Sequence, residues 1–152
     1  MKAKKDLIGN IIKIGINENI FGFGRIVEGG FIEFYDLKLS NDQIEGINEK
    51  LIGSKVIFTL SVHKSWEKNK NWEVVGKNLN NVSSIPYQFM QSIGNQNDIK
   101  IIDSTGNSRP ATKDEVKGIE RLAVWEDNHV EDRLRDYFDG KQNIWVEHLK
   151  PK

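Results

Sequence analysis

The residue best able to exchange a proton near neutral pH is histidine, and this chain has three. They share no metal-ligand spacing: His63, His129 and His148. His63 directly precedes Lys64 and, with Arg25 and Tyr35, could form a metal-free ribonuclease set. Such a reaction needs a proton acceptor and a cation for the phosphate. A partly exposed surface histidine is the simpler interpretation, and both readings stay open.

A lysine-rich stretch follows His63 and contains one tryptophan, Trp66. It reads Lys-Ser-Trp-Glu-Lys-Asn-Lys over residues 64–70. Basic residues interleaved with aromatic ones can hold single-stranded nucleic acid through charge and stacking. With three lysines and one ring, the stretch is more typical of a solvated hairpin tip. Trp66, and as an outside candidate Tyr87, could instead supply an aromatic anchor for a protein partner.

The glycines in Gly22-Phe23-Gly24 resemble the start of a nucleotide-binding loop. No third glycine follows at the required spacing, and no helix start follows to hold a phosphate. In an extended strand Phe21, Phe23 and Arg25 would share one face, leaving Gly22 and Gly24 on the other. Two positions without side chains favour close approach by another backbone or an aromatic ring. We therefore interpret these glycines as packing positions.

The chain has no cysteine, which excludes disulfides, thiolate metal sites and cysteine nucleophiles. With 22 basic and 22 acidic residues, no overall field favours nucleic acid or a membrane. No apolar run approaches the roughly 20 residues of a membrane span. The basic opening resembles a secretory signal, but Asn10 and Lys13 interrupt its apolar stretch. We expect one cytoplasmic domain over residues 1–152, with no catalytic residues, cofactor or metal.

The balanced total hides a local excess of carboxylates. Residues 111–140 contain nine acidic and five basic residues, a net charge of −4, so the rest carries +4. If Val130, Leu134 and Phe138 face inward on a helix, the exposed arc holds three aspartates and a glutamate: Glu131, Asp132, Asp136 and Asp139. Glu126 and Asp127 extend the arc at the helix start, where the helix dipole favours negative charge. The arc could be a solvated face or a docking surface for a basic partner.

The front half has the pattern of an antiparallel meander. Isoleucine-rich residues 8–16 predict a first strand, residues 20–27 a second and residues 31–37 a third, with turns at 17–19 and 29–30. Further strands are predicted at 55–62 and 72–75. Ser40 and Gln43 resemble a capping box for a short helix that would run to Leu51 and be weakened by Gly46.

The back half is predicted to be mainly helical. After a strand at 99–102, Thr112 and Glu115 match a capping box, and apolar spacing predicts a helix to about Trp125. A second helix would start at Asp127 or Asn128 and end at Gly140. Residues 144–146 could add an edge strand. We therefore predict an α+β fold: a bent antiparallel β-sheet or partial barrel with two C-terminal helices.

The order of these segments resembles the immunity protein 26 family, part of the bacterial polymorphic-toxin and contact-dependent growth inhibition systems. The similar segments lie at residues 9–14 (GNIIKI), 21–25 (FGFGR), 34–36 (FYD), 72–76 (WEVVG), 85–89 (IPYQF) and 109–112 (RPAT). The resemblance implies a non-enzymatic, toxin-neutralising protein that binds the C-terminal toxin domain delivered by a neighbouring cell. It implies a protein partner and no direct contact with nucleic acid or membrane.

Such toxins are often nucleases, whose substrate grooves are basic, and an acidic helix face suits that target. The predicted toxin-binding residues are Glu126, Asp127, Glu131, Asp132, Asp136, Asp139 and Trp66. An antitoxin of this kind would block its target by occlusion. The alternatives are a metal-free RNA-processing enzyme or RNA-binding module that uses His63 and the lysine-rich stretch, and a structural interaction domain without a toxin partner.

Overall fold

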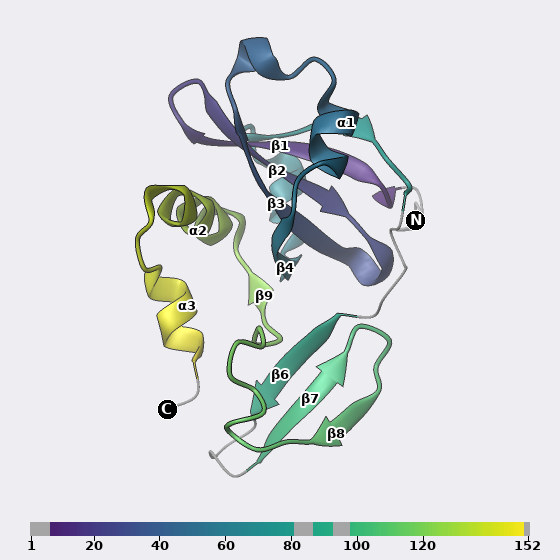
Figure 1. The fold of residues 1–152 in the computed structure, drawn as a ribbon, viewed down its shortest axis with the longest axis vertical. Helices are drawn as coiled ribbons and strands as arrows, with labels where there is room; N and C mark the ends of the chain where they lie inside the picture. Colours follow the sequence, from purple (N-terminus) through teal and green to yellow (C-terminus); the bar gives the residue numbers. More distant parts are fainter. Residues whose placement is uncertain (1–6, 81–86, 93–97, 151–152) are drawn as a thin grey trace.

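A computed structural model of the chain describes residues 7–80, 87–92 and 98–150 (Figure 1). Its main element is a six-stranded sheet with strand order β5-β1-β2-β3-β4-β9. The bounds are β1 (Asn10–Asn17), β2 (Ile20–Ile26), β3 (Phe31–Leu39), β4 (Val56–Val62), β5 (Trp72–Lys77) and β9 (Val124–Trp125). All pairings are antiparallel except that of β4 with β9. The sheet does not close into a barrel, and the predicted α+β class is confirmed.

A second sheet of three antiparallel strands lies below the main sheet in Figure 1. It consists of β6 (Gln88–Ser92), β7 (Ile99–Asp103) and β8 (Ser108–Pro110). The two sheets touch through a stacked ring pair, Phe31 and Phe89, whose centroids are 5.0 Å apart. Only β7 was expected from the sequence. Ile85 and Pro86, the first two residues of the family-like segment at 85–89, lie outside the described residues.

The two C-terminal helices are α2 (Asp127–Asp139) and α3 (Ile144–Leu149), which pack together beside the sheets (Figure 1). Val130 and Leu134 of α2 are fully buried against the main sheet. Gly140 ends α2 in the left-handed conformation, with φ of 70°, as predicted. The edge strand expected at residues 144–146 is wrong. Asn143 caps a helix there instead, because its Oδ1 accepts a hydrogen bond from the Val146 amide at 3.0 Å.

The helix expected between Thr112 and Trp125 is also wrong, although its capping box forms. Thr112 N donates to Glu115 Oε1 at 2.9 Å, and Glu115 N donates to Thr112 Oγ1 at 3.2 Å. The chain then makes only turns, and Gly118 has φ of 78°, which a continuing helix cannot accommodate. Beyond the turns, residues 120–122 run alongside β6 before β9 joins β4.

The same contrast occurs at the first capping box. Ser40 and Gln43 form it, but Gly46 has φ of 76° and separates a single 3-10 turn, Asn41–Gln43, from α1 (Ile47–Ile52).

The predicted meander of β1, β2 and β3 is confirmed. Within the described residues, no helix combines the length and apolar character needed to cross a membrane.

The paired strand glycines pack as the sequence predicted. A methyl group on Gly24 would lie 2.9 Å from the Ile32 side chain and 3.1 Å from the Phe34 ring. A methyl group on Gly22 would lie 3.4 Å from Leu134 of α2. The absent side chains therefore let an aromatic ring and a helix approach the sheet closely.

Candidate functional site

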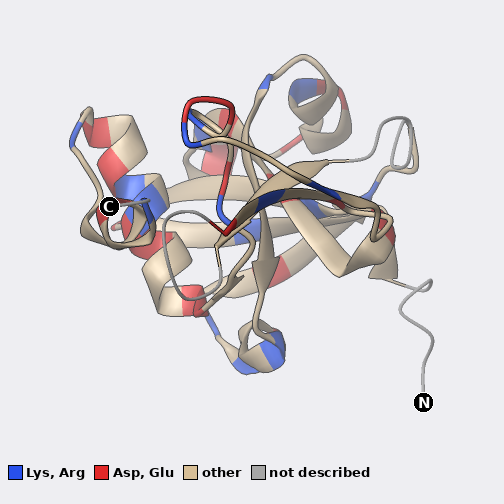
Figure 2. Cartoon of the chain, turned by 90° about the horizontal axis from the view of Figure 1, so that it is seen from below, with Lys and Arg blue, Asp and Glu red and all other residues tan. Residues whose placement is uncertain are grey.

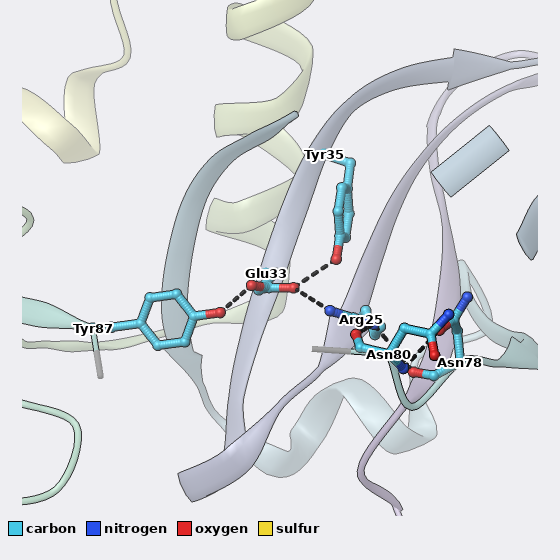
Figure 3. Close-up of polar contacts among 6 residues, drawn as sticks. All are labelled: Arg25, Glu33, Tyr35, Asn78, Asn80 and Tyr87. Atoms are coloured by element: carbon cyan, nitrogen blue, oxygen red, sulfur yellow. Dashed lines mark hydrogen bonds and ion pairs between the residues drawn. The ribbon is translucent and has the colours of Figure 1, made fainter. Parts of the chain in front are cut away.

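The most concentrated buried polar group lies on β2 and β3 (Figure 3). Arg25 and Glu33 are directly paired across these strands, and Tyr35 lies two residues further along β3 on the same face. Arg25 Nη2 is 3.0 Å from Glu33 Oε1, and the Tyr35 hydroxyl donates to the same oxygen at 2.6 Å. The hydroxyl of Tyr87, which directly precedes β6, donates to Glu33 Oε2. We call Arg25, Glu33, Tyr35 and Tyr87 the Glu33 cluster.

Arg25 also fixes the chain that leaves β5. Its Nη1 donates to the carbonyl oxygens of Asn80 at 2.6 Å and Asn78 at 3.2 Å. Its Nε is buried without a hydrogen-bond partner among the described residues. Since Arg25 and Glu33 are each only 6% exposed, the guanidinium is held by partners inside the protein.

The two tyrosines of the cluster serve as hydrogen-bond donors. Burial raises the pKa of Tyr35 far above its ordinary value, and the hydrogen bond to Glu33 raises it further. Burial and the bond to Glu33 raise the pKa of Tyr87 in the same way. Neither hydroxyl can therefore act as a base near neutral pH. The cluster is suited to joining β2, β3, the chain after β5 and the start of the second sheet.

A pocket of about 440 Å³ opens beside the cluster, between α1 and the edge of β3 and β4. Arg25, Glu33 and Tyr35 line its polar side. Its rim includes Ile52 and Val56, which are 57% and 41% exposed. The pocket could receive a side chain of another molecule, but the charges inside it already neutralise each other.

The proposed ribonuclease set is not brought together. Tyr35 lies opposite Val56, seven residues before His63, a separation of about 23 Å in an extended strand. His63 is exposed, and its Nδ1 accepts a hydrogen bond from Ser65 N at 3.2 Å. The Arg25 guanidinium is already paired with the Glu33 carboxylate. Within the described parts of the chain, no three His, Asp or Glu side chains are grouped to hold a metal ion.

The expectation that Trp66 lies exposed on a hairpin tip is wrong. It lies in a 3-10 turn, Lys64–Lys68, and is only 8% exposed. Its ring packs 6.0 Å from that of Trp72 in the main core. The intermediate exposure of Tyr87, whose hydroxyl is bonded to Glu33, also makes it a poor anchor.

The expected exposure of Glu131 is also wrong, because this carboxylate is 9% exposed and turned toward the main sheet. Its Oε2 accepts hydrogen bonds from Trp72 Nε1 at 2.8 Å and Asn69 Nδ2 at 3.0 Å. Helical spacing placed it one position from the inward-facing Val130, at the border of the apolar face. The bonding partners lie about sixty residues away, so local sequence carried no signal of them.

The other acidic residues in α2 and at its N-cap differ in exposure and in hydrogen bonding. Glu126 and Asp139 are exposed. Three aspartates are half-buried and bonded: Asp127 to Asn69 at 2.9 Å, Asp132 to Arg135 at 3.0 Å and Trp145 at 3.1 Å, and Asp136 to Asn143 at 2.9 Å. Figure 2 shows acidic and basic positions interleaved along the C-terminal helices. The role of these residues in toxin binding stays a prediction.

The described geometry is that of an α+β scaffold whose buried charged cluster joins strands to one another. The family model described as Immunity protein 26 matches residues 8–100, which is more than half of the chain. The chain therefore belongs to the immunity protein 26 family, and its general role is that of an immunity protein. No curated protein and no solved structure matches the chain.

The matched range has a clear relation to the fold. It contains β1 to β6, all of the Glu33 cluster and the whole lining of the pocket beside it. The helices α2 and α3 lie outside it. The resemblance to the family is thus confirmed by a match over residues 8–100. The predicted acidic contact residues lie in the part of the chain that the family model does not match.

Proposed function

We propose that this protein binds the C-terminal domain of a cognate bacterial toxin and neutralises it by covering its active surface. Membership of the immunity protein 26 family is the observation that carries this proposal. The RNA-processing alternative gains no support from the positions of His63 and Arg25.

We propose further that the toxin is a nuclease and that the outer side of α2 meets its basic substrate groove. The exposed carboxylates of Glu126 and Asp139, at the two ends of the helix, are the strongest candidates. Asp127, Asp132 and Asp136 add partly screened negative charge between them. We no longer include Glu131 and Trp66 among the predicted toxin-binding residues, because both are buried in the free protein.

Electrostatic steering by α2 can be tested through the rate at which the protein associates with the toxin domain. Reversing both end charges, in the double variant E126K/D139K, should slow association with the toxin domain about tenfold at low salt. The effect should shrink as salt rises, since exposed charges are screened. Stopped-flow mixing with candidate toxin domains measures this rate.

The matched control is E28K/E45K, which makes the same change in net charge at two exposed glutamates away from α2. It should slow association much less. Equal rates for both double variants would refute steering by α2 while leaving neutralisation itself intact. No binding by the unmodified protein to any nuclease toxin domain would refute the choice of target.

A further inference from the structure

A second pocket, also of about 440 Å³, lies between residues 113–121, β6 and the C-terminal helices. Backbone bonds set its position, because Met90 N donates to the Glu120 carbonyl at 2.7 Å and Leu122 N donates to the Met90 carbonyl at 2.8 Å. These bonds hold residues 120–122 beside β6. The pocket is therefore lined by segments that are distant in sequence.

The inner wall of this pocket is apolar. Met90 and Val116 are 1% and 3% exposed, and Ile119, Val146 and Leu149 complete the apolar lining. The volume is at the lower end of the range found for small-molecule sites. An apolar group of matching size would be driven into it by the hydrophobic effect.

The polar lining is strongly basic. Five cations and one carboxylate contribute to it among the described residues: Lys113, Lys117, Arg121, Arg133, Lys150 and Glu120. Glu120 holds Arg133 through two bonds of 2.9 and 3.0 Å, so this carboxylate is already used. Lys117 and Lys150 have surface partners, Asp114 and Glu147.

Arg121 differs from these cations. Its Nε donates to the Leu149 carbonyl at 2.6 Å, which fixes the half-buried side chain. Its two terminal nitrogens have no hydrogen-bond or ion-pair partner in the part of the chain that the structure describes. A fixed guanidinium with open donors matches a carboxylate in two-point geometry.

We propose that this pocket binds a carboxylate joined to an apolar chain, with the carboxylate on Arg121 and the chain against Met90, Val116 and Ile119. This site goes beyond the proposed toxin neutralisation and does not depend on it. The same chemistry can come from a free acyl acid or from neighbouring acidic and apolar residues of a polypeptide.

Titration of the full chain with octanoate, below the concentration at which it forms micelles, tests the site. Amide NMR shifts should change around residues 116–121 and 146–149, and octanamide, which lacks the charge, should bind at least about tenfold more weakly. Acetate, which lacks the chain, should leave these signals unchanged. Equal binding of octanoate and octanamide would overturn the proposal.

Two variants locate the site. Arg121→Gln should weaken octanoate binding about tenfold or more, whereas the control Lys64→Gln, which removes an exposed cation elsewhere, should not. Because Arg121 also holds Leu149, Ile119→Ser tests the apolar wall separately and should weaken binding as well. Unchanged octanoate affinity in either folded pocket variant would overturn the proposal.

A parallel titration with the acetylated peptide Glu-Leu-Leu-Glu distinguishes the two sources. Tighter binding of octanoate would assign the pocket to a free acyl acid, and tighter binding of the peptide would assign it to a polypeptide. Absence of binding by both probes would overturn the proposal.

Discussion

Glu33 joins β2, β3 and the residue that precedes β6. It accepts hydrogen bonds from Arg25, Tyr35 and Tyr87, and Arg25 in turn holds the carbonyls of Asn78 and Asn80. The sequence suggested Arg25 and Tyr35 as candidates for chemistry, and the structure does bring these two together. The sequence did not indicate that Arg25 and Tyr35 bond to a shared carboxylate, because Glu33 has the pattern of an ordinary charged residue in a strand.

The first residue-scale prediction concerns the buried ion pair. Glu33→Gln leaves the Arg25 guanidinium buried without a counter-charge, which should lower the free energy of unfolding by about 3 kcal/mol. Urea denaturation measures this change in the free energy of unfolding. The matched control is Glu73→Gln, which breaks an ion pair with Lys13 whose glutamate is 63% exposed and should cost below about 1 kcal/mol. Equal losses for the two variants would contradict the assigned role.

The raised pKa values of Tyr35 and Tyr87 lead us to predict that the protein loses stability at alkaline pH. Their pKa values are raised in the folded state, so the unfolded chain ionises first, from its ordinary pKa of 10.0. Stability is therefore fully present below pH 10 and falls above it, by up to about 1.4 kcal/mol per pH unit for the buried Tyr35 and by less for the half-buried Tyr87. Denaturation midpoints between pH 8 and pH 11 measure the slope. Tyr35→Phe should reduce this slope, and an unchanged slope would contradict the burial of its hydroxyl.

At the scale of elements, alternation and turn residues predicted the meander, whereas tertiary contacts decided the C-terminal half. Both capping boxes form, yet Gly46 and Gly118 adopt positive φ and stop the helices that should follow. Residues 144–146 have strand-favouring side chains, but Asn143 caps a helix there and Trp145 stacks on His129 at 3.7 Å. The Asn143 cap is a local bond that competes with the strand-favouring side chains. The stacking of Trp145 on His129 joins α3 to α2, so no local pattern could specify that contact.

The close packing around β2 gives a prediction at this scale. Gly24→Ala would press a methyl group into Ile32 and Phe34 and should destabilise the protein by about 1–3 kcal/mol. Gly76→Ala on β5 is the control, since its methyl group would meet ordinary contacts of 3.4 Å or more. Thermal unfolding compares them, and a stability for Gly24→Ala equal to that of the control would show that the sheet adjusts freely.

At the scale of the whole molecule, the immunity protein 26 family model matches the part of the chain that contains β1 to β6, whereas β8, β9 and the C-terminal helices lie outside the matched range. The order of short segments predicted the family, although none of the segments is a catalytic motif. The exposure of the candidate contact residues was harder to predict. Glu131 is buried through hydrogen bonds from Asn69 and Trp72, and Trp66 packs on Trp72. Helical spacing alone does not reveal these contacts between distant segments.

The most direct test of neutralisation by binding is a titration of the toxin's activity, which we propose to be that of a nuclease. The toxin domain is held at fixed concentration well above the dissociation constant while the purified protein is added. We predict that activity falls linearly and ends at one equivalent, and that the protein alone cleaves no RNA or DNA. Full toxin activity at excess protein, or inactivation by a small fraction of an equivalent, would contradict the account.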